Sequence, residues 1–200
     1  MTFKLGLTGS IGMGKSTTAA IFADQGCGVW DADAVVHQLY AENGAAVAPL
    51  AAVFPQVVNE QSICRLALKR LISDVPDALQ QIEKIVHPLV VRDRQSFIEQ
   101  AEQSKQAVLV FDIPLLYETH SQQKFDAVAC VYISPDEQRR RVMDRGTMTD
   151  AQFDYILSKQ MPNSEKQGLS DYLIETDSVP HVMAQVAAII KDIKDQTIHA

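Results

Sequence analysis

Short apolar runs alternate along the chain with longer segments whose apolar residues recur at helical spacing. The runs that fit buried strands lie at residues 3–8, 28–31, 107–112, 127–133 and 171–175. Helical patterns cover residues 15–25 and 33–42, and a last helix of about 179–195 places its apolar residues on one face. Strands separated by helices predict βαβ units and a parallel sheet covered on both faces.

Residues 45–106 interrupt this alternation because they carry no strong strand signal. Helical patterns within this segment cover residues 62–73, 76–86 and 88–104. The segment lies between the second and third predicted strands and is too long for a simple crossover connection. We therefore expect a helical subdomain over the edge of the sheet.

A glycine-rich loop follows the first predicted strand and precedes the first helix. Its sequence from Gly9 to Ser16, G-S-I-G-M-G-K-S, fits the pattern G-x-x-x-x-G-K-[ST]. Backbone N–H groups of such a loop, together with a helix N-terminus, form a site for phosphate. Lys15 is then expected to reach the β- and γ-phosphates, Ser16 to bind Mg²⁺, and Thr17 to contact the α-phosphate. The alternative, a glycine-rich turn with an exposed lysine, fits the flanking strand and helix poorly.

Three aspartates stand where predicted strands end. Asp31 and Asp33 follow the second strand, and Asp112 ends the third. The carboxyl ends of parallel strands flank the ligand crevice of an open α/β sheet, so these acids are expected near the phosphate loop. Phosphoryl transfer needs a carboxylate that orients or deprotonates the acceptor. The residues alone leave open that Asp33 caps the next helix, and that Asp31 and Asp112 have only structural roles.

Four arginines lie close together after the fourth predicted strand. The pattern Ser134, Pro135, Glu137 predicts a capping box that opens their helix, and Thr149 with Gln152 predicts a second one, opening a helix to about residue 161. We expect a lid helix that delivers one or two guanidinium groups to ATP phosphates, and a solvated face for the others. The four arginines are Arg139, Arg140, Arg141 and Arg145.

Composition narrows the classes of function. The 200 residues are 46% hydrophobic and 22% charged, which fits one globular domain with a sizeable core. A net charge of −7 argues against general binding to nucleic acid or to an anionic membrane. No 18-residue apolar run and no export signal is seen, and the three cysteines form neither a zinc pattern nor a disulfide framework. We expect a cytoplasmic protein.

Taken together, these motifs make the chain resemble the dephospho-CoA kinase family over nearly its whole length. The phosphate loop alone indicates only a P-loop nucleotide binder, but the further motifs, in this order and spacing, are far more specific. The matching segments are residues 5–9, 14–17, 31–33 (D-A-D), 85–88 (I-V-H-P), 112–118 (D-I-P-L-L-Y-E), the arginines at 139–145, and residues 160–162 and 171–174.

The resemblance implies a P-loop NTPase fold like that of nucleoside monophosphate kinases, a three-layer α/β sandwich around a five-stranded parallel sheet. It implies one kinase domain, residues 1–200, whose core comprises about 1–44 and 107–200. The resemblance also implies a helical CoA-binding subdomain at about 45–106 and a mobile lid at about 139–165. The implied reaction is transfer of the ATP γ-phosphate to the ribose 3′-hydroxyl of dephospho-CoA. The alternative is a P-loop kinase for a nucleoside monophosphate or another small alcohol.

Roles for individual residues also come from the resemblance. The implied catalytic residues are Asp33, Lys15 and Arg140. Contacts to ATP are implied for Gly9, Gly12, Met13, Gly14, Lys15, Ser16, Thr17 and Arg140. Substrate contacts are implied for Thr8, Asp33, Arg65, His87 and Asp112. Mg²⁺ is expected on Ser16, with Asp33 or Asp112 bound through water, and the chain is expected to be a monomer or weak homo-oligomer.

The chain departs from the family's usual sequence at a few positions. Ser10 and Met13 replace a glycine and a serine of the phosphate loop, at positions where the motif accepts any residue. Cys64 stands where the family often has aspartate. Near the last strand, Glu175 and Thr176 replace an Asp-Asn pair in a segment that commonly borders the adenine of ATP. Contacts to the nucleotide base are therefore the least transferable part of the resemblance.

Overall fold

The computed structural model describes residues 2–198, so residues 1, 199 and 200 of the predicted domain lie outside the described residues. The chain divides into two compact units. The first comprises the described residues up to Trp30 and from Ala101 onward, and the second comprises Asp31–Gln100. Each unit has its own cluster of buried apolar residues.

The first unit is built on a parallel sheet, which among the described residues has five strands. They are β1 (Phe3–Thr8), β2 (Gly28–Asp31), β5 (Val108–Asp112), β6 (Ala127–Tyr132) and β7 (Tyr172–Glu175). The strand order is β2-β5-β1-β6-β7, and β1 pairs in parallel with both β5 and β6. The predicted α/β fold and its five-stranded parallel sheet are confirmed, with strand ends within about one residue of those expected.

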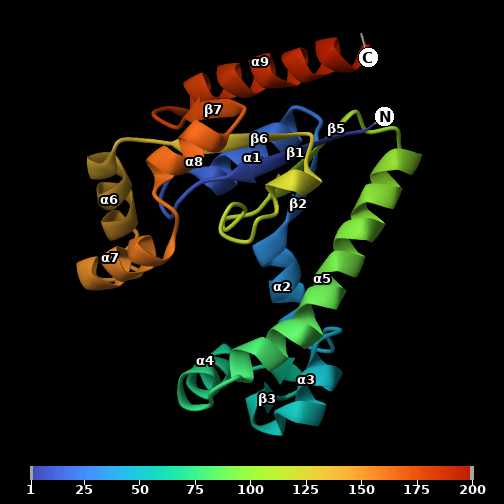
Figure 1. Ribbon diagram of the computed structural model, residues 1–200, viewed down its shortest axis with the longest axis vertical. Helices are drawn as coiled ribbons and strands as arrows, with labels where there is room; N and C mark the ends of the chain where they lie inside the picture. The colour runs from blue at the N-terminus through green and yellow to red at the C-terminus, as the bar shows by residue number, and fades with distance from the viewer. Residues whose placement is uncertain (1, 199–200) are drawn as a thin grey trace. The chain divides into compact units, whose positions relative to one another are not determined.

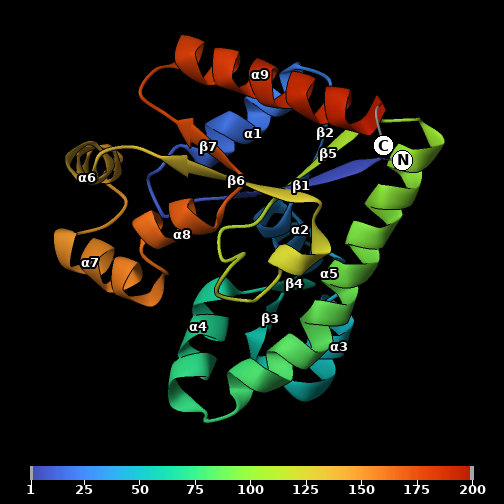
Figure 2. The ribbon, with the colours of Figure 1, turned by 45° about the horizontal axis from the view of Figure 1, so that its top comes forward.

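Helices cover both faces of this sheet (Figure 2). α1 (Lys15–Asp24) and α9 (Val179–Ile198) pack side by side on one face, where alternate residues of β1, Leu5 and Leu7, are fully buried. α8 (Asn163–Leu169) packs against β6 on the opposite face. On that face Gly6 lets the loop after β5 approach closely, because a Cβ there would lie 2.7 Å from Leu116 Cδ1.

Two helices follow β6 before α8. α6 (Pro135–Asp144) begins at Ser134, whose hydroxyl accepts from the Glu137 amide, and α7 (Asp150–Lys159) begins with a reciprocal capping box between Thr149 and Gln152. The second predicted capping box is therefore confirmed. The first is only half formed, because the Glu137 carboxylate binds arginines of its own helix. α8 was not predicted, since its seven polar-rich residues show no apolar periodicity.

The second unit contains α2 (Ala32–Tyr40), α3 (Val47–Val53), α4 (Arg65–Asp74) and most of α5 (Ala78–Gln103), which are drawn in Figure 1. Two predictions here were wrong. Ser62 and Ile63 form β4, which pairs with β3 (Val58–Asn59), so the helix expected from residue 62 begins only at Arg65. The helices expected at 76–86 and 88–104 are one helix that runs through Pro88. A proline inside a helix costs a backbone hydrogen bond, and here the packing of Val86 before it and of Leu89 after it against the apolar cluster of this unit offsets that cost.

Two of the three cysteine thiols are buried. Cys27, Cys64 and Cys130 all lie in the described range and are free thiols. Burial raises the pKa of the Cys27 and Cys130 thiols to about 11 in each case. Within residues 2–198 no helix combines the length and the apolar character that crossing a membrane would require.

Candidate active site

The loop between β1 and α1 needs glycine at two positions. Gly12 and Gly14 have φ angles of 80° and 83°, in the left-handed region that residues with a side chain rarely adopt. Each also lies against a neighbour: a Cβ on Gly12 would meet the Val142 side chain, and one on Gly14 would lie 3.1 Å from Thr176. The motif glycines therefore permit both the turn and its close packing.

Side-chain amides hold the first half of this loop. The Ser10 amide donates to Asn163 Oδ1 over 3.2 Å, and the Ile11 amide donates to Gln160 Oε1 over 3.1 Å. The Ile11 carbonyl accepts from Gln138 Nε2 over 2.6 Å. Gln138 and Asn163 were not predicted as site residues, because a glutamine or asparagine in a polar segment gives no signal of such a role.

The second half of the loop presents unpaired donors. Within the described part of the chain, no acceptor takes the backbone N–H groups of Gly12 or of residues 14–17. Four of these groups stand at the N-terminus of α1, where the helix dipole favours negative charge. α1 has no side-chain cap and no acidic residue in its first turn. The loop and helix therefore form a site suited to a phosphate group.

Lys15 and Asp112 meet at this site. The register of β1 and β5 pairs Leu7 with Asp112, which brings the end of β5 beside the loop that follows β1. The Lys15 ammonium forms an ion pair and hydrogen bond with Asp112 Oδ1. The Asp112 side chain is only 1% exposed and that of Lys15 is 13% exposed. The structure thus brings together these two predicted site residues.

Thr8, another predicted site residue, is fully buried and contacts the loop after β5. Its hydroxyl donates to the Pro114 carbonyl over 3.2 Å, and the same carbonyl accepts from Lys166 Nζ over 3.0 Å. Lys166 is itself fully buried and pairs with Glu118 Oε1 at 2.9 Å. Lys166 was not predicted, because a lysine in a polar helix normally indicates an exposed residue.

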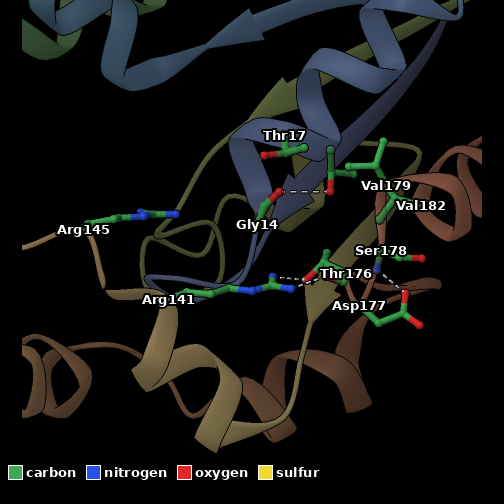
Figure 3. A pocket seen from close by; sticks show the side chains of 10 residues that line it. Gly14, Thr17, Arg141, Arg145, Thr176, Asp177, Ser178, Val179 and Val182 are labelled. Atoms are coloured by element: carbon green, nitrogen blue, oxygen red, sulfur yellow. Dashed lines mark hydrogen bonds between the residues drawn. The ribbon is translucent and has the colours of Figure 1, made fainter. Parts of the chain in front are cut away.

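The arginines of α6 divide into two groups. Arg140 is bound by Glu137 and Asp144, each at 2.7 Å, and Arg139 by Asp150 and Asp154. Arg141 and Arg145 instead line a cavity of about 250 Å³ beside the phosphate loop. Figure 3 shows both side chains extending toward Gly14, Thr17 and Thr176.

Glu137 connects two of these arginines. Its carboxylate accepts from Arg140 Nη2 over 2.7 Å and from Arg141 Nε over 2.8 Å. These hydrogen bonds, with Arg140 first, lower the pKa of Glu137 to about 2. Glu137 is therefore ionised at neutral pH and holds the two guanidinium groups on one side of α6.

The remaining predicted site residues belong to the second unit. Asp31 Oδ1 accepts from the amides of Asp33 and Ala34 at 2.8 and 3.0 Å, so Asp31 is the N-cap of α2. The Asp33 side chain is exposed in the first turn and is not the cap. Arg65 opens α4, and its Nη2 lies 2.9 Å from His37 Nδ1, while His87 is exposed on α5.

The family model that matches this chain describes dephospho-CoA kinase and covers residues 3–181. The chain belongs to the dephospho-CoA kinase family. The dephospho-CoA kinase of Ruegeria pomeroyi is 56% identical over 200 residues, with all of both chains covered. That of a Jannaschia species is 49% identical over 98% of this chain and 100% of its own length.

Solved structures share the fold of this chain. A crystal structure from Thermus thermophilus is 27% identical with a TM-score of 0.82, over 96% of this chain and 97% of the other. The dephospho-CoA kinase of Campylobacter jejuni, at 22% identity and a TM-score of 0.72, covers 98% of this chain and has the same fold. The resemblance inferred from the motifs and the assignment to the kinases are confirmed, and the nucleoside monophosphate kinase alternative is not favoured.

Proposed function

We propose that this chain transfers the γ-phosphate of ATP to the ribose 3′-hydroxyl of dephospho-CoA, the last step of coenzyme A biosynthesis. Family membership supports the reaction. The observation that carries the proposal is the set of unpaired N–H groups at Gly12 and residues 14–17, beside the Lys15 ammonium. These donors suit a triphosphate, whose transferred group gains charge stabilisation from them during the reaction.

Mg²⁺ belongs to the proposal as the companion of ATP. The Ser16 hydroxyl and the Asp112 carboxylate, the latter through water, offer the oxygen ligands that Mg²⁺ prefers, with Asp33 as the other predicted carboxylate. When bound, the ion would supply positive charge that stabilises the phosphates. The ion pair of Lys15 with Asp112 places a cation and a carboxylate side by side at the phosphate loop, where Lys15 would bind phosphate oxygens and Asp112 would hold the hydrated ion.

For the acceptor, we propose Asp33 as the carboxylate that orients or deprotonates the 3′-hydroxyl. Asp31 caps α2, so the Asp33 carboxylate is not required for that helix. Arg65, with its exposed guanidinium beside His37, is proposed as a contact for dephospho-CoA, together with His87. A substrate contact for Thr8 remains a prediction. Its hydroxyl donates a hydrogen bond to the Pro114 carbonyl.

The lid is proposed to contribute two arginines with different tasks. Arg141 lines the cavity next to Gly14 and is suited to binding the nucleotide. Arg140 is exposed and held by Glu137 and Asp144, so it must exchange these acids for a phosphate oxygen. Such an exchange suits a contact made only when the lid closes for phosphoryl transfer.

A product assay tests the function. The purified chain is incubated with Mg-ATP and with dephospho-CoA, AMP, CMP or pantothenate, and the products are identified by mass and by the position of the new phosphate. We expect ADP and CoA from dephospho-CoA alone. Phosphorylation of AMP or CMP in preference to dephospho-CoA would overturn the proposal in favour of a nucleoside monophosphate kinase.

Lys15→Ala serves as the inactive control for this assay. The Lys15 ammonium is proposed to stabilise the charge on the phosphates, so turnover is expected to fall at least a hundredfold. The buried Asp112 loses its ion-pair partner in this variant, so the thermal unfolding midpoint is expected to fall as well, and turnover is measured well below that midpoint. Lys191→Ala, at an 81% exposed lysine on α9, is the matched control and should retain wild-type turnover. Full activity of Lys15→Ala would remove the role of the phosphate loop.

A further inference from the structure

The hydroxyl of Thr176 lies between the phosphate loop and α6. Thr176 follows β7, is 6% exposed, and donates its backbone N–H to the Tyr132 carbonyl over 2.9 Å. Its hydroxyl oxygen is 2.9 Å from the Met13 carbonyl and 3.2 Å from that of Tyr132. A hydroxyl has one proton to donate, and the Met13 carbonyl is the nearer acceptor.

Arg141 binds the same residue from the other side. Its Nη1 donates to the Thr176 hydroxyl over 3.2 Å and its Nη2 to the Thr176 carbonyl over 2.7 Å. Figure 3 shows the guanidinium pointing at Thr176, with Gly14 nearby. A chain of hydrogen bonds therefore runs from a cation on α6, through one hydroxyl, to a carbonyl of the phosphate loop.

The carbonyl that ends this chain belongs to the same peptide group as the Gly14 N–H. Because a peptide group is planar, fixing the Met13 carbonyl also fixes the direction of that N–H. Among the described residues, no acceptor takes the Gly14 N–H. A hydrogen bond at the carbonyl end, strengthened by the charge of Arg141, also polarises the peptide and makes its N–H a better donor.

We propose that Thr176 is a positioning residue for ATP, whose hydroxyl couples Arg141 of α6 to the Met13–Gly14 peptide of the phosphate loop. Arg141 and the Gly14 N–H then take up their orientations together. The phosphate-loop motif of residues 9–16 does not include Thr176, so the motif alone does not assign it this role. The inference rests on the proposed function only in taking ATP as the ligand.

The test compares Thr176→Val, which removes the hydroxyl and keeps the side-chain shape, with Thr176→Ser, which keeps the hydroxyl. ATP affinity is measured by calorimetric titration in the absence of dephospho-CoA. We expect the valine variant to bind ATP about three- to tenfold more weakly, which is the usual effect of losing one hydrogen bond between uncharged groups. The serine variant should restore most of that loss, and the KM for dephospho-CoA should stay unchanged.

Thr197→Val is the matched control, because it removes a hydroxyl that donates to the Ile193 carbonyl within α9. It should bind ATP like the wild type. The same titration on Arg141→Met and on the double variant measures the coupling: the losses from Thr176→Val and Arg141→Met should be less than additive. If Thr176→Val does not fold, Thr176→Ala removes the same hydroxyl and replaces it in the comparison with Thr176→Ser.

Unchanged ATP affinity in the valine variant, a lower unfolding midpoint without weaker binding, or failure of serine to restore binding would each overturn the proposal. Titration with ATP measures binding without the reaction, so failure of this proposal can be told apart from failure of the proposed function. A wild-type chain that binds ATP but does not phosphorylate dephospho-CoA would contradict the proposed function. The ATP affinities of the Thr176 variants would still decide the role of Thr176.

Discussion

Two aspartates one residue apart have different tasks in this chain. Asp31 accepts two backbone N–H groups at the start of α2, while Asp33 lies in the first turn with its carboxylate exposed. The helix therefore needs the side chain of Asp31 and does not need that of Asp33. An acid that the fold does not use is free for chemistry, which is the basis for proposing Asp33 as the residue that orients the acceptor hydroxyl.

Asp33→Asn tests this assignment. The amide keeps the size of the side chain but cannot accept a proton, so kcat is expected to fall by about 10²- to 10⁴-fold, the usual range for a lost acid–base group. ATP affinity, measured by titration, should change little. Asp31→Asn is the matched control, because asparagine caps a helix about as well as aspartate and should leave kcat close to wild type. A defect of Asp33→Asn confined to KM for ATP would contradict the assignment.

Sequence reasoning at this scale makes its most definite predictions where a motif imposes its residues. The glycines, Lys15 and Ser16 follow from the geometry of a phosphate loop, and Asp112 follows from its place at the end of β5. The residues that support the loop could not be predicted. Gln138 reaches the Ile11 carbonyl and Lys166 the Pro114 carbonyl from helices far along the chain, and nothing in their local sequence indicates those contacts.

At the scale of elements, one carboxylate of α6 binds two arginines of the same helix. Glu137 holds Arg140 and Arg141, and its pKa of about 2 sets the pH range of this arrangement. A carboxylate with a lowered pKa keeps its partners above its ordinary pKa and releases them only as the pH falls through the lowered value. The ion pairs of Glu137 with Arg140 and Arg141 should therefore persist from neutral pH to below pH 4, and pH dependence of the reaction between pH 6 and 8 has to come from groups other than Glu137.

Single-turnover kinetics distinguish the two arginines. Arg140→Ala should slow phosphoryl transfer at saturating ATP by at least tenfold with little change in ATP affinity, because its contact is made on closure. Arg141→Ala should mainly weaken ATP binding, because this residue lines the cavity already. Arg139→Ala, whose partners are Asp150 and Asp154, is the control and should affect neither quantity. An unchanged single-turnover rate for Arg140→Ala would move its role to Arg141 or Arg145.

The elements themselves were predictable where a pattern was long enough to show its period. The strands and the helices α1 and α9 have continuous apolar patterns and were placed correctly to within a few residues. The pair β3 and β4 has two residues in each strand, too few for a period, and proline at position 88 suggested a break that burial on both sides prevents. Short elements are decided by tertiary contacts, which a local pattern does not contain.

For the whole molecule, the order of strands and helices was sufficient to predict the fold class. Alternating elements admit few arrangements other than a covered parallel sheet, and the phosphate loop selects one of them. The sequence also indicated a helical block, but not which residues form its core. In the second unit that core joins α3, α4 and α5 through Leu50, Leu71 and Ile82. Such a contact set depends on how separate helices meet, which periodicity alone does not specify.

The stability of the first unit gives a final prediction, because one buried ion pair links α8 to the loop after β5. Lys166 is fully buried, pairs with Glu118 at 2.9 Å and donates to the Pro114 carbonyl, which also holds Thr8. Lys166→Met would leave the Glu118 carboxylate without its cation, and breaking a buried pair in this way costs about 3–5 kcal/mol of unfolding free energy. Denaturant unfolding measures this loss.

Lys191→Met is the matched control, since Lys191 pairs with Asp195 only at 3.8 Å and is 81% exposed. Its loss should cost no more than about 1 kcal/mol, as for other surface pairs. The double variant Lys166→Met with Glu118→Leu removes both charges and should recover much of the stability lost in the single variant. A single variant as stable as the wild type would mean that water reaches Glu118 and replaces the lysine. In that case the pair would not be what anchors the loop that follows Asp112.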